Sequence, residues 1–245
     1  MKDYLIDTHA HLDMMTELDI KGVGKVIVPA VELATLDKVV SLSEIDNVYS
    51  MVGIYPSEAK TYSEDVEQKI IELAKNNKVV AIGEIGLDYY WDKSFIELQK
   101  EVFIKQIKLA NSLNLPIVVH DREAHKDCFD IVKEYNNNSK VLFHCFSGSV
   151  EFMRECVKQG WYIALGGVVT FKNAIKMKEV AKEVPLNKLV LETDSPYLTP
   201  VPFRGKENKP AYTYYVAEEI AKLRGMDITE IINITTKNAE EFFNI

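Results

Sequence analysis

The stretch Tyr4-Leu-Ile-Asp-Thr-His-Ala-His-Leu-Asp13 places two imidazoles two residues apart, directly after a short apolar run. We expect this run to be a buried β-strand, and side chains at positions i and i+2 of a strand share a face. His9 and His11 would then lie close enough to hold one metal ion between them. A lone His-x-His pattern is a weak signal, so its weight depends on the rest of the chain.

Short β-rich runs alternate with longer amphipathic stretches along the sequence. We expect strands, most of them nearly all apolar, at Tyr4–His9, Lys25–Val31, Val48–Ile54, Val79–Ile85, Pro116–His120, Lys140–Phe146, Tyr162–Leu165 and Leu189–Asp194. We expect helices at Glu32–Glu44, Ser63–Asn76, Phe95–Leu113, Arg122–Tyr135, Val150–Gln159, Lys172–Val184, Tyr212–Arg224 and Thr229–Phe243. This alternation predicts an α/β fold, a (β/α)8 TIM barrel formed as one domain by residues 1–245. A doubly wound sheet is the alternative, but no glycine-rich phosphate turn follows the first strand.

Composition favours an ordinary enzyme-sized protein. The 245 residues are 47% hydrophobic and carry a net charge of -8, which argues against a surface that grips nucleic acid everywhere but leaves a local basic groove possible. Three cysteines without a Cys-x-x-Cys pair suggest reduced thiols, and we expect Cys145 to be a buried apolar residue. The polar N-terminus and the lack of a long apolar run predict a cytoplasmic protein without a membrane partner, with a monomer as the default.

Candidate metal ligands occur at the C-terminal ends of the expected strands, where barrel enzymes carry their active sites. They are His9, His11, Glu84, His120, His144 and Asp194. In a closed barrel the last strand neighbours the first, and the fifth neighbours the sixth, so these side chains should converge. Four imidazoles and two carboxylates suit two divalent ions, Zn2+ or Mn2+ better than Mg2+, with one carboxylate bridging. Burying them without a metal would be costly, which favours ligation over purely structural roles.

Basic and polar side chains accompany these ligands. Arg122, Arg204 and Lys206 are expected to bind substrate by neutralising charge on phosphoryl oxygens, although solvated surface charge is the alternative, especially for Lys206. Glu192 is expected to orient a ligand without binding metal, and His125 to lie at the surface or behind a ligand.

Aromatic side chains and one long loop also stand near the strand ends. Tyr89, Tyr90, Trp91 and Tyr197 could stack nucleobases or pack their own loops. The proline-rich segment Ser195–Ala211 is longer than most connections in compact domains, which favours a functional loop.

The sequence resembles the TatD family of metal-dependent hydrolases, often described as TatD-like deoxyribonucleases. The matching stretches are Asp7-Thr-His-Ala-His-Leu-Asp13, Gly83-Glu-Ile-Gly-Leu-Asp-Tyr-Tyr90, Val118-Val-His-Asp-Arg-Glu-Ala124, Phe143-His-Cys-Phe-Ser-Gly148, Leu191-Glu-Thr-Asp-Ser-Pro-Tyr-Leu198 and Arg204-Gly-Lys206. The resemblance implies a (β/α)8 fold, two divalent metals held by the six ligands above, and a 3′→5′ exonuclease acting on DNA. One departure is Glu207-Asn-Lys-Pro210, which reverses both charges of the family's usual Arg-Asn-Glu-Pro and bears on substrate affinity.

The functional hypothesis is metal-dependent hydrolysis of DNA phosphodiester bonds by a hydroxide between two ions. Asp194 is the candidate general base, and Glu84 is the bridging carboxylate. An acyl hydrolase acting on an amide or an aminoacyl-tRNA ester is the second hypothesis, although the fourth strand lacks the lysine that some amidohydrolases carboxylate. A non-catalytic metal or nucleic-acid binding protein is the third, but it would be expected to have lost a ligand.

Overall fold

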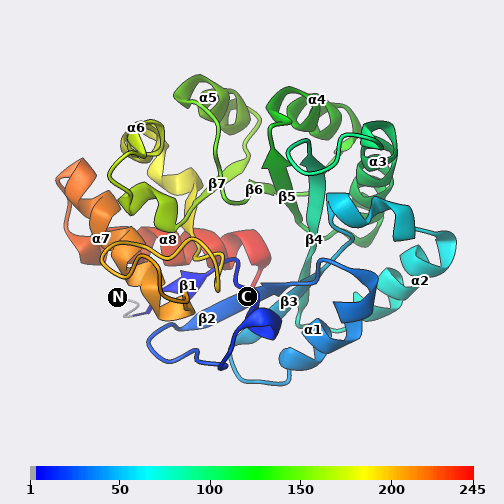
Figure 1. The fold of residues 1–245 in the computed structure, drawn as a ribbon, viewed down its shortest axis with the longest axis horizontal. Helices are drawn as coiled ribbons and strands as arrows, with labels where there is room; N and C mark the ends of the chain where they lie inside the picture. The colour runs from blue at the N-terminus through cyan, green and yellow to red at the C-terminus, as the bar shows by residue number, and fades with distance from the viewer. Residues whose placement is uncertain (1–3) are drawn as a thin grey trace. The chain divides into compact units, whose positions relative to one another are not determined.

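A computed structural model describes residues 4–245 and confirms the (β/α)8 fold class (Figure 1). Strands and helices alternate along the chain. The strands are β1 (Ile6–Asp7), β2 (Lys25–Pro29), β3 (Val48–Val52), β4 (Val79–Asp88), β5 (Ile117–Arg122), β6 (Val141–Phe143), β7 (Tyr162–Leu165) and β8 (Leu189–Leu191). The α-helices are α1 (Leu36–Leu42), α2 (Glu64–Leu73), α3 (Ile96–Leu113), α4 (His125–Tyr135), α5 (Val150–Lys158), α6 (Ile175–Glu183), α7 (Thr213–Arg224) and α8 (Ile228–Phe243).

The chain divides into two compact units. The first unit comprises the described residues up to Val28 together with His144–Ile245, and the second unit comprises Pro29–Phe143. Within the first unit β1 pairs with β2 and β7 with β8, in both cases in parallel. Within the second unit β3, β4, β5 and β6 pair in parallel in that order. The expectation that residues 1–245 are one domain stays a prediction.

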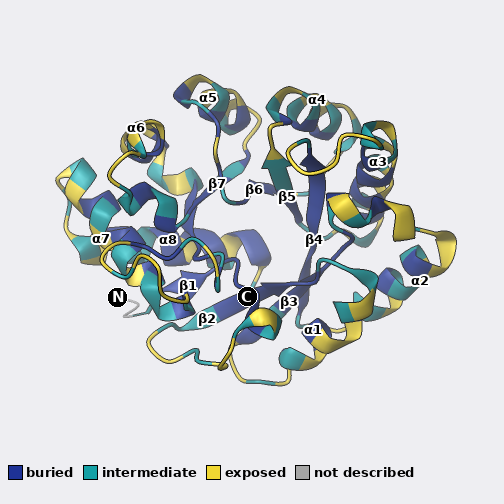
Figure 2. Cartoon of the chain, viewed as in Figure 1, coloured by how far each residue is buried: buried dark blue, intermediate teal, exposed yellow. Residues whose placement is uncertain are grey.

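Most strand residues are buried and the helices are amphipathic, as Figure 2 shows within each unit. All ten residues of β4 are buried, and they include the polar Glu84 and Asp88. Serine caps begin two of the helices, because the Ser63 and Ser149 side chains accept hydrogen bonds from the backbone of the first turn. Burial of apolar β-strands beneath amphipathic helices therefore explains the fold class that the sequence pattern predicts.

Several expected strand ends were wrong, and the corrections bear on the candidate site. β1, β6 and β8 stop before the residues predicted to lie in them, so His9, His144 and Asp194 occupy the segments that follow the strands. At Asp194 the backbone has a φ of 58°, a left-handed conformation that a strand ladder does not accept.

The prediction for Cys145 was also wrong. Its φ is 42°, and the residue is half-buried instead of buried, because the chain has already turned out of β6. In the second unit β4 continues to Asp88 and β5 to Arg122, so α4 begins at His125 and not at the expected Arg122.

Two glutamines of α3 hold strand ends in the second unit. The Gln106 side chain accepts a hydrogen bond from the Ile54 N–H (2.8 Å) and donates one to the Ile54 carbonyl (3.0 Å). Gln99, two helical turns earlier, makes the same pair of bonds with the backbone of Asp88 at 3.0 and 3.1 Å. These bonds satisfy buried backbone N–H and C=O groups at the ends of the strands.

Among residues 4–245 no helix has both the length and the apolar character that crossing a bilayer requires.

Replacing Gln106 by leucine is expected to destabilise the protein, because the buried N–H and C=O of Ile54 lose their partners. The free energy of unfolding, measured by urea denaturation, should fall by about 1–3 kcal/mol. Gln68→Leu is the matched control, since Gln68 is exposed on α2 and bonds only a neighbouring glutamate, Glu72. Equal losses in the two variants would contradict the role given to Gln106.

Candidate metal centre

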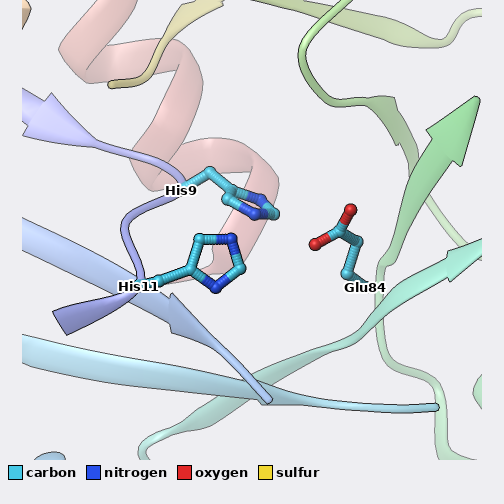
Figure 3. Close-up of side chains that lie close together, drawn as sticks. All are labelled: His9, His11 and Glu84. Atoms are coloured by element: carbon cyan, nitrogen blue, oxygen red, sulfur yellow. The ribbon is translucent and has the colours of Figure 1, made fainter. Parts of the chain in front are cut away.

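Three of the predicted imidazole ligands lie together in the first unit. His9 and His11 follow β1, and their ring centroids are 5.1 Å apart with planes at 71° (Figure 3). The His144 ring stacks on that of His9 at 3.8 Å and 13°. All three side chains are buried.

Asp194 stands beside this group. One of its carboxylate oxygens, Oδ1, is 3.4 Å from His11 Nε2 and 3.8 Å from His9 Nε2. Burial raises the pKa of Asp194, but the hydrogen bond from His11 and the positive potential of His9, His11 and His144 outweigh it, so the pKa lies below its ordinary value. An ionised carboxylate in this position can bind a cation or accept a proton.

Glu192 contacts His144 from the segment after β8. The Glu192 side chain is fully buried, with Oε1 accepting the Cys145 N–H at 2.7 Å and Oε2 3.5 Å from His144 Nδ1. Donor atoms of His9, His144 and Glu192 lie within 4.8 Å of one another, close enough to hold a metal ion. The expectation that Glu192 orients a ligand without binding metal stays a prediction, because Glu192 itself also offers a donor atom.

Asp7 is a residue of this region that the sequence reasoning missed. Its carboxylate accepts hydrogen bonds from the backbone of His9 (3.2 Å) and from both the backbone (2.9 Å) and the hydroxyl (2.5 Å) of Thr193. Burial raises the pKa of Asp7 well above its usual range, in spite of these bonds. Asp7 thus connects the segment after β1 to the segment after β8, and its place at the start of Asp-Thr-His-Ala-His was the available signal.

In the second unit Glu84 and His120 form a close pair. Glu84 Oε1 is 2.6 Å from His120 Nδ1. The other ring nitrogen, His120 Nε2, lies 3.1 Å from Asp88 Oδ2 and 2.9 Å from the Tyr55 hydroxyl, which itself donates to Asp88 Oδ2 at 2.8 Å. Asp88 and Tyr55 were not among the predicted site residues. Asp88 could have been found from its place in the Gly-Glu-Ile-Gly-Leu-Asp motif, but no local pattern marks Tyr55.

These contacts determine which nitrogen of His120 carries a proton. Burial raises the pKa of Asp88, but hydrogen bonds from His120, Tyr55 and Tyr90 lower it to about 2, so the group is a carboxylate. Burial, reinforced by the charges of Glu84 and Asp88, raises the pKa of Tyr55, so the phenol keeps its proton and donates it to Asp88. Nε2 of His120 must therefore be the donor to this cluster, which leaves Nδ1 facing Glu84.

A nitrogen lone pair and a carboxylate oxygen at 2.6 Å need a cation between them. A proton satisfies this requirement, and so does a metal ion. Buried imidazoles and carboxylates form a mixed N/O donor set of the kind that binds Zn2+ or Mn2+. The residues of both units therefore fit divalent metal ions, whereas joint ligation by all six predicted residues stays a prediction.

The three predicted substrate-binding cations are exposed and lie against aromatic rings. The guanidinium of Arg122 is 4.0 Å from the Tyr90 ring centroid, and that of Arg204 is 3.9 Å from the Phe171 centroid. Lys206 Nζ lies 5.8 Å from the Phe203 centroid. Their contact with substrate stays a prediction.

The reversed charges after Arg204-Gly-Lys206 have structural partners in the first unit. The Glu207 carboxylate accepts hydrogen bonds from the backbone (3.0 Å) and hydroxyl (2.5 Å) of Thr16, and Lys209 Nζ lies 3.4 Å from Asp19. Between them the buried Asn208 donates to the carbonyls of Thr193 and Tyr197. Glu207 and Lys209, the residues that depart from the family pattern, thus attach the proline-rich loop to the segment after His11.

Comparisons with known proteins agree on one family. The family model described as TatD related DNase matches residues 6–244. An uncharacterised metal-dependent hydrolase of Bacillus subtilis, YabD, is 45% identical over 98% of this chain and 99% of its own length. Another, YcfH of Escherichia coli K12, is 37% identical over 99% and 96%. The crystal structure of YjjV, a TatD homologue from E. coli K12, superposes with a TM-score of 0.91 at 31% identity, covering 98% of each chain.

Asp88→Asn is expected to weaken divalent metal binding, because an amide can present an N–H to Nε2 and so favour the tautomer that protonates Nδ1. Loss of such an orienting partner typically weakens metal affinity about 10–100-fold, which isothermal titration with Zn2+ would measure. Asp46→Asn, an exposed substitution in the same unit, is the control and should bind metal as the wild type does. Unchanged affinity in Asp88→Asn, with the fold intact by circular dichroism, would contradict the tautomer assignment.

Proposed function

The chain belongs to the TatD related DNase family of metal-dependent hydrolases, and from this premise we propose that it is a deoxyribonuclease. It would hydrolyse phosphodiester bonds of DNA, removing nucleotides from single-stranded 3′ ends. The observation that carries the proposal is that each unit holds imidazoles and carboxylates, most of them buried, within or directly after its parallel strands, since this donor set suits hydrolytic metals. We also propose that the protein acts as a cytoplasmic monomer.

The six predicted ligands would serve two ions. His9, His11, Glu84 and Asp194 would hold the first ion. Glu84, His120 and His144 would hold the second. Such ions, when bound, activate water as a nucleophile and stabilise negative charge on the attacked phosphoryl group. Zn2+, Mn2+ and Mg2+ are the candidates.

The protein's own groups would carry out the remaining steps. Asp194, ionised because of its imidazole neighbours, would accept the proton of the attacking water. Arg122, Arg204 and Lys206 would neutralise charge that develops on the phosphoryl oxygens. The Asp7 bridge to Thr193 would keep the histidine segment and the Asp194 segment in register during the reaction.

Asp194→Asn is expected to lower kcat about 10²–10⁴-fold, because the amide cannot accept the proton of water. The measurement is nucleotide release from 5′-labelled single-stranded DNA with Mn2+ or Mg2+, and removal of metal by EDTA should abolish release. Glu84→Gln should lose both activity and bound metal, whereas Asp46→Asn should change neither. A product ladder that shortens from the 3′ end would establish the polarity.

Two outcomes would count against the proposal. Cleavage that persists undiminished in Asp194→Asn and Glu84→Gln would belong to a contaminating nuclease. Metal-dependent turnover of an aminoacyl-tRNA ester or an amide, with DNA left uncut, would assign the same centre to acyl hydrolysis.

A further inference from the structure

Two aromatic side chains of the second unit are strongly exposed directly after β4. Tyr90 is 50% exposed and Trp91 is 68% exposed. Their ring centroids are 4.8 Å apart and their planes are nearly perpendicular, at 86°. They therefore offer ring surface to solvent in place of packing into the core.

A guanidinium completes this surface. Arg122, the last residue of β5, places its guanidinium carbon 4.0 Å from the Tyr90 centroid and 5.3 Å from the Trp91 centroid. The carbonyl of Arg122 accepts a hydrogen bond from the Tyr89 N–H at 2.9 Å, which joins the loop after β4 to the end of β5. We call Tyr90, Trp91 and Arg122 the stacking platform.

The platform is held in place by the backbone beneath it. Asp88 Oδ1 accepts hydrogen bonds from the N–H groups of Tyr90 (2.9 Å) and Trp91 (3.3 Å). Gln99 of α3 donates to the carbonyls of Asp88 and Asp92, at 3.1 and 3.4 Å. Exposed rings on an anchored backbone lose little conformational entropy when a flat ligand stacks on them.

The platform is also adjacent to the candidate metal ligands of the same unit. Arg122 lies two residues after His120 on β5, and Asp88, which anchors Tyr90 and Trp91 through Oδ1, contacts His120 through Oδ2. The charges nearby do not favour a purely electrostatic contact with DNA. Lys93 is paired with Glu123 at 3.8 Å, and the whole chain carries a net charge of -8.

We propose that the stacking platform binds an unpaired nucleobase and so selects single-stranded over duplex DNA. The proposal deepens the proposed function, on which it rests. Every base has a π-face that an indole, a phenol or a guanidinium plane can stack against, and a paired base inside a duplex does not expose that face. Arg122 would keep its charge available for a neighbouring phosphate.

Intrinsic fluorescence provides the test, because the chain has two tryptophans and the other, Trp161, is only 6% exposed. The metal-loaded full-length protein is titrated with a phosphorothioate single strand that resists hydrolysis, with an abasic strand of the same length and linkages, and with the matching duplex. We expect the single strand to quench the emission and to bind about 5- to 150-fold more tightly than the abasic strand, the range typical of base stacking on an aromatic side chain. The duplex should bind more weakly than the single strand.

Variants separate the platform from general binding. Trp91→Ala should lose the preference for the natural over the abasic strand, and Trp91→Phe should largely retain it. The control is Tyr214→Ala, since Tyr214 of α7 is also an exposed aromatic residue. This control should bind DNA as the wild type does. Because Trp91→Ala removes the fluorophore, its binding is followed by anisotropy of a labelled strand. Equal affinity for the abasic and natural strands, an unchanged Trp91→Ala, or a preference for duplex would each overturn the proposal.

Binding and cleavage can fail independently in this design. Base-dependent binding through Trp91 without any DNA cleavage would leave the platform standing and refute the nuclease. Cleavage of natural DNA by a protein that binds the abasic and natural strands equally well would refute the platform and leave the nuclease standing.

Discussion

Glu84 and His120 approach to 2.6 Å inside the second unit, and two such atoms stay together only with a cation between them. That requirement organises the residues around the pair. Tyr55 and Asp88 take up the other side of the imidazole, so the ring presents Nδ1 toward the carboxylate. The hydrogen bonds of Tyr55 and Asp88 therefore create a position between His120 and Glu84 that requires a cation, either a proton or a metal ion.

Asp88 connects the Glu84–His120 pair to exposed residues at the protein surface. One carboxylate oxygen orients His120, the other anchors the backbone of Tyr90 and Trp91, and the main chain of Asp88 is itself held by Gln99. A buried carboxylate with every lone pair engaged is costly to rearrange, because each lost partner leaves a desolvated charge. The candidate ligand and the exposed aromatic loop are thereby parts of one rigid arrangement.

In the first unit Asp7 and Asn208 likewise connect segments that are far apart in the sequence. Asp7 joins the histidine segment to Thr193, and Asn208 joins the proline-rich loop to the Thr193 carbonyl, so both converge on the residue before Asp194. Glu207 and Lys209 bind Thr16 and Asp19 of the segment after His11. The charge reversal that we expected to bear on substrate affinity thus also has a structural role in fastening this loop.

The sequence by itself determined the fold class, because apolar runs alternating with amphipathic helices have few other ways to bury their surfaces. It also placed the candidate ligands on the strands or close to their ends: Glu84 and His120 lie within β4 and β5, whereas His9 and Asp194 follow β1 and β8. Only the tertiary structure decided where the strands stop and which groups face the ligands: the turn at Asp194, the contact of Glu192 with His144, and the engagement of His120 by Tyr55 and Asp88. These depend on backbone conformations outside the period of a strand and on partners far apart in the chain, which no local pattern encodes.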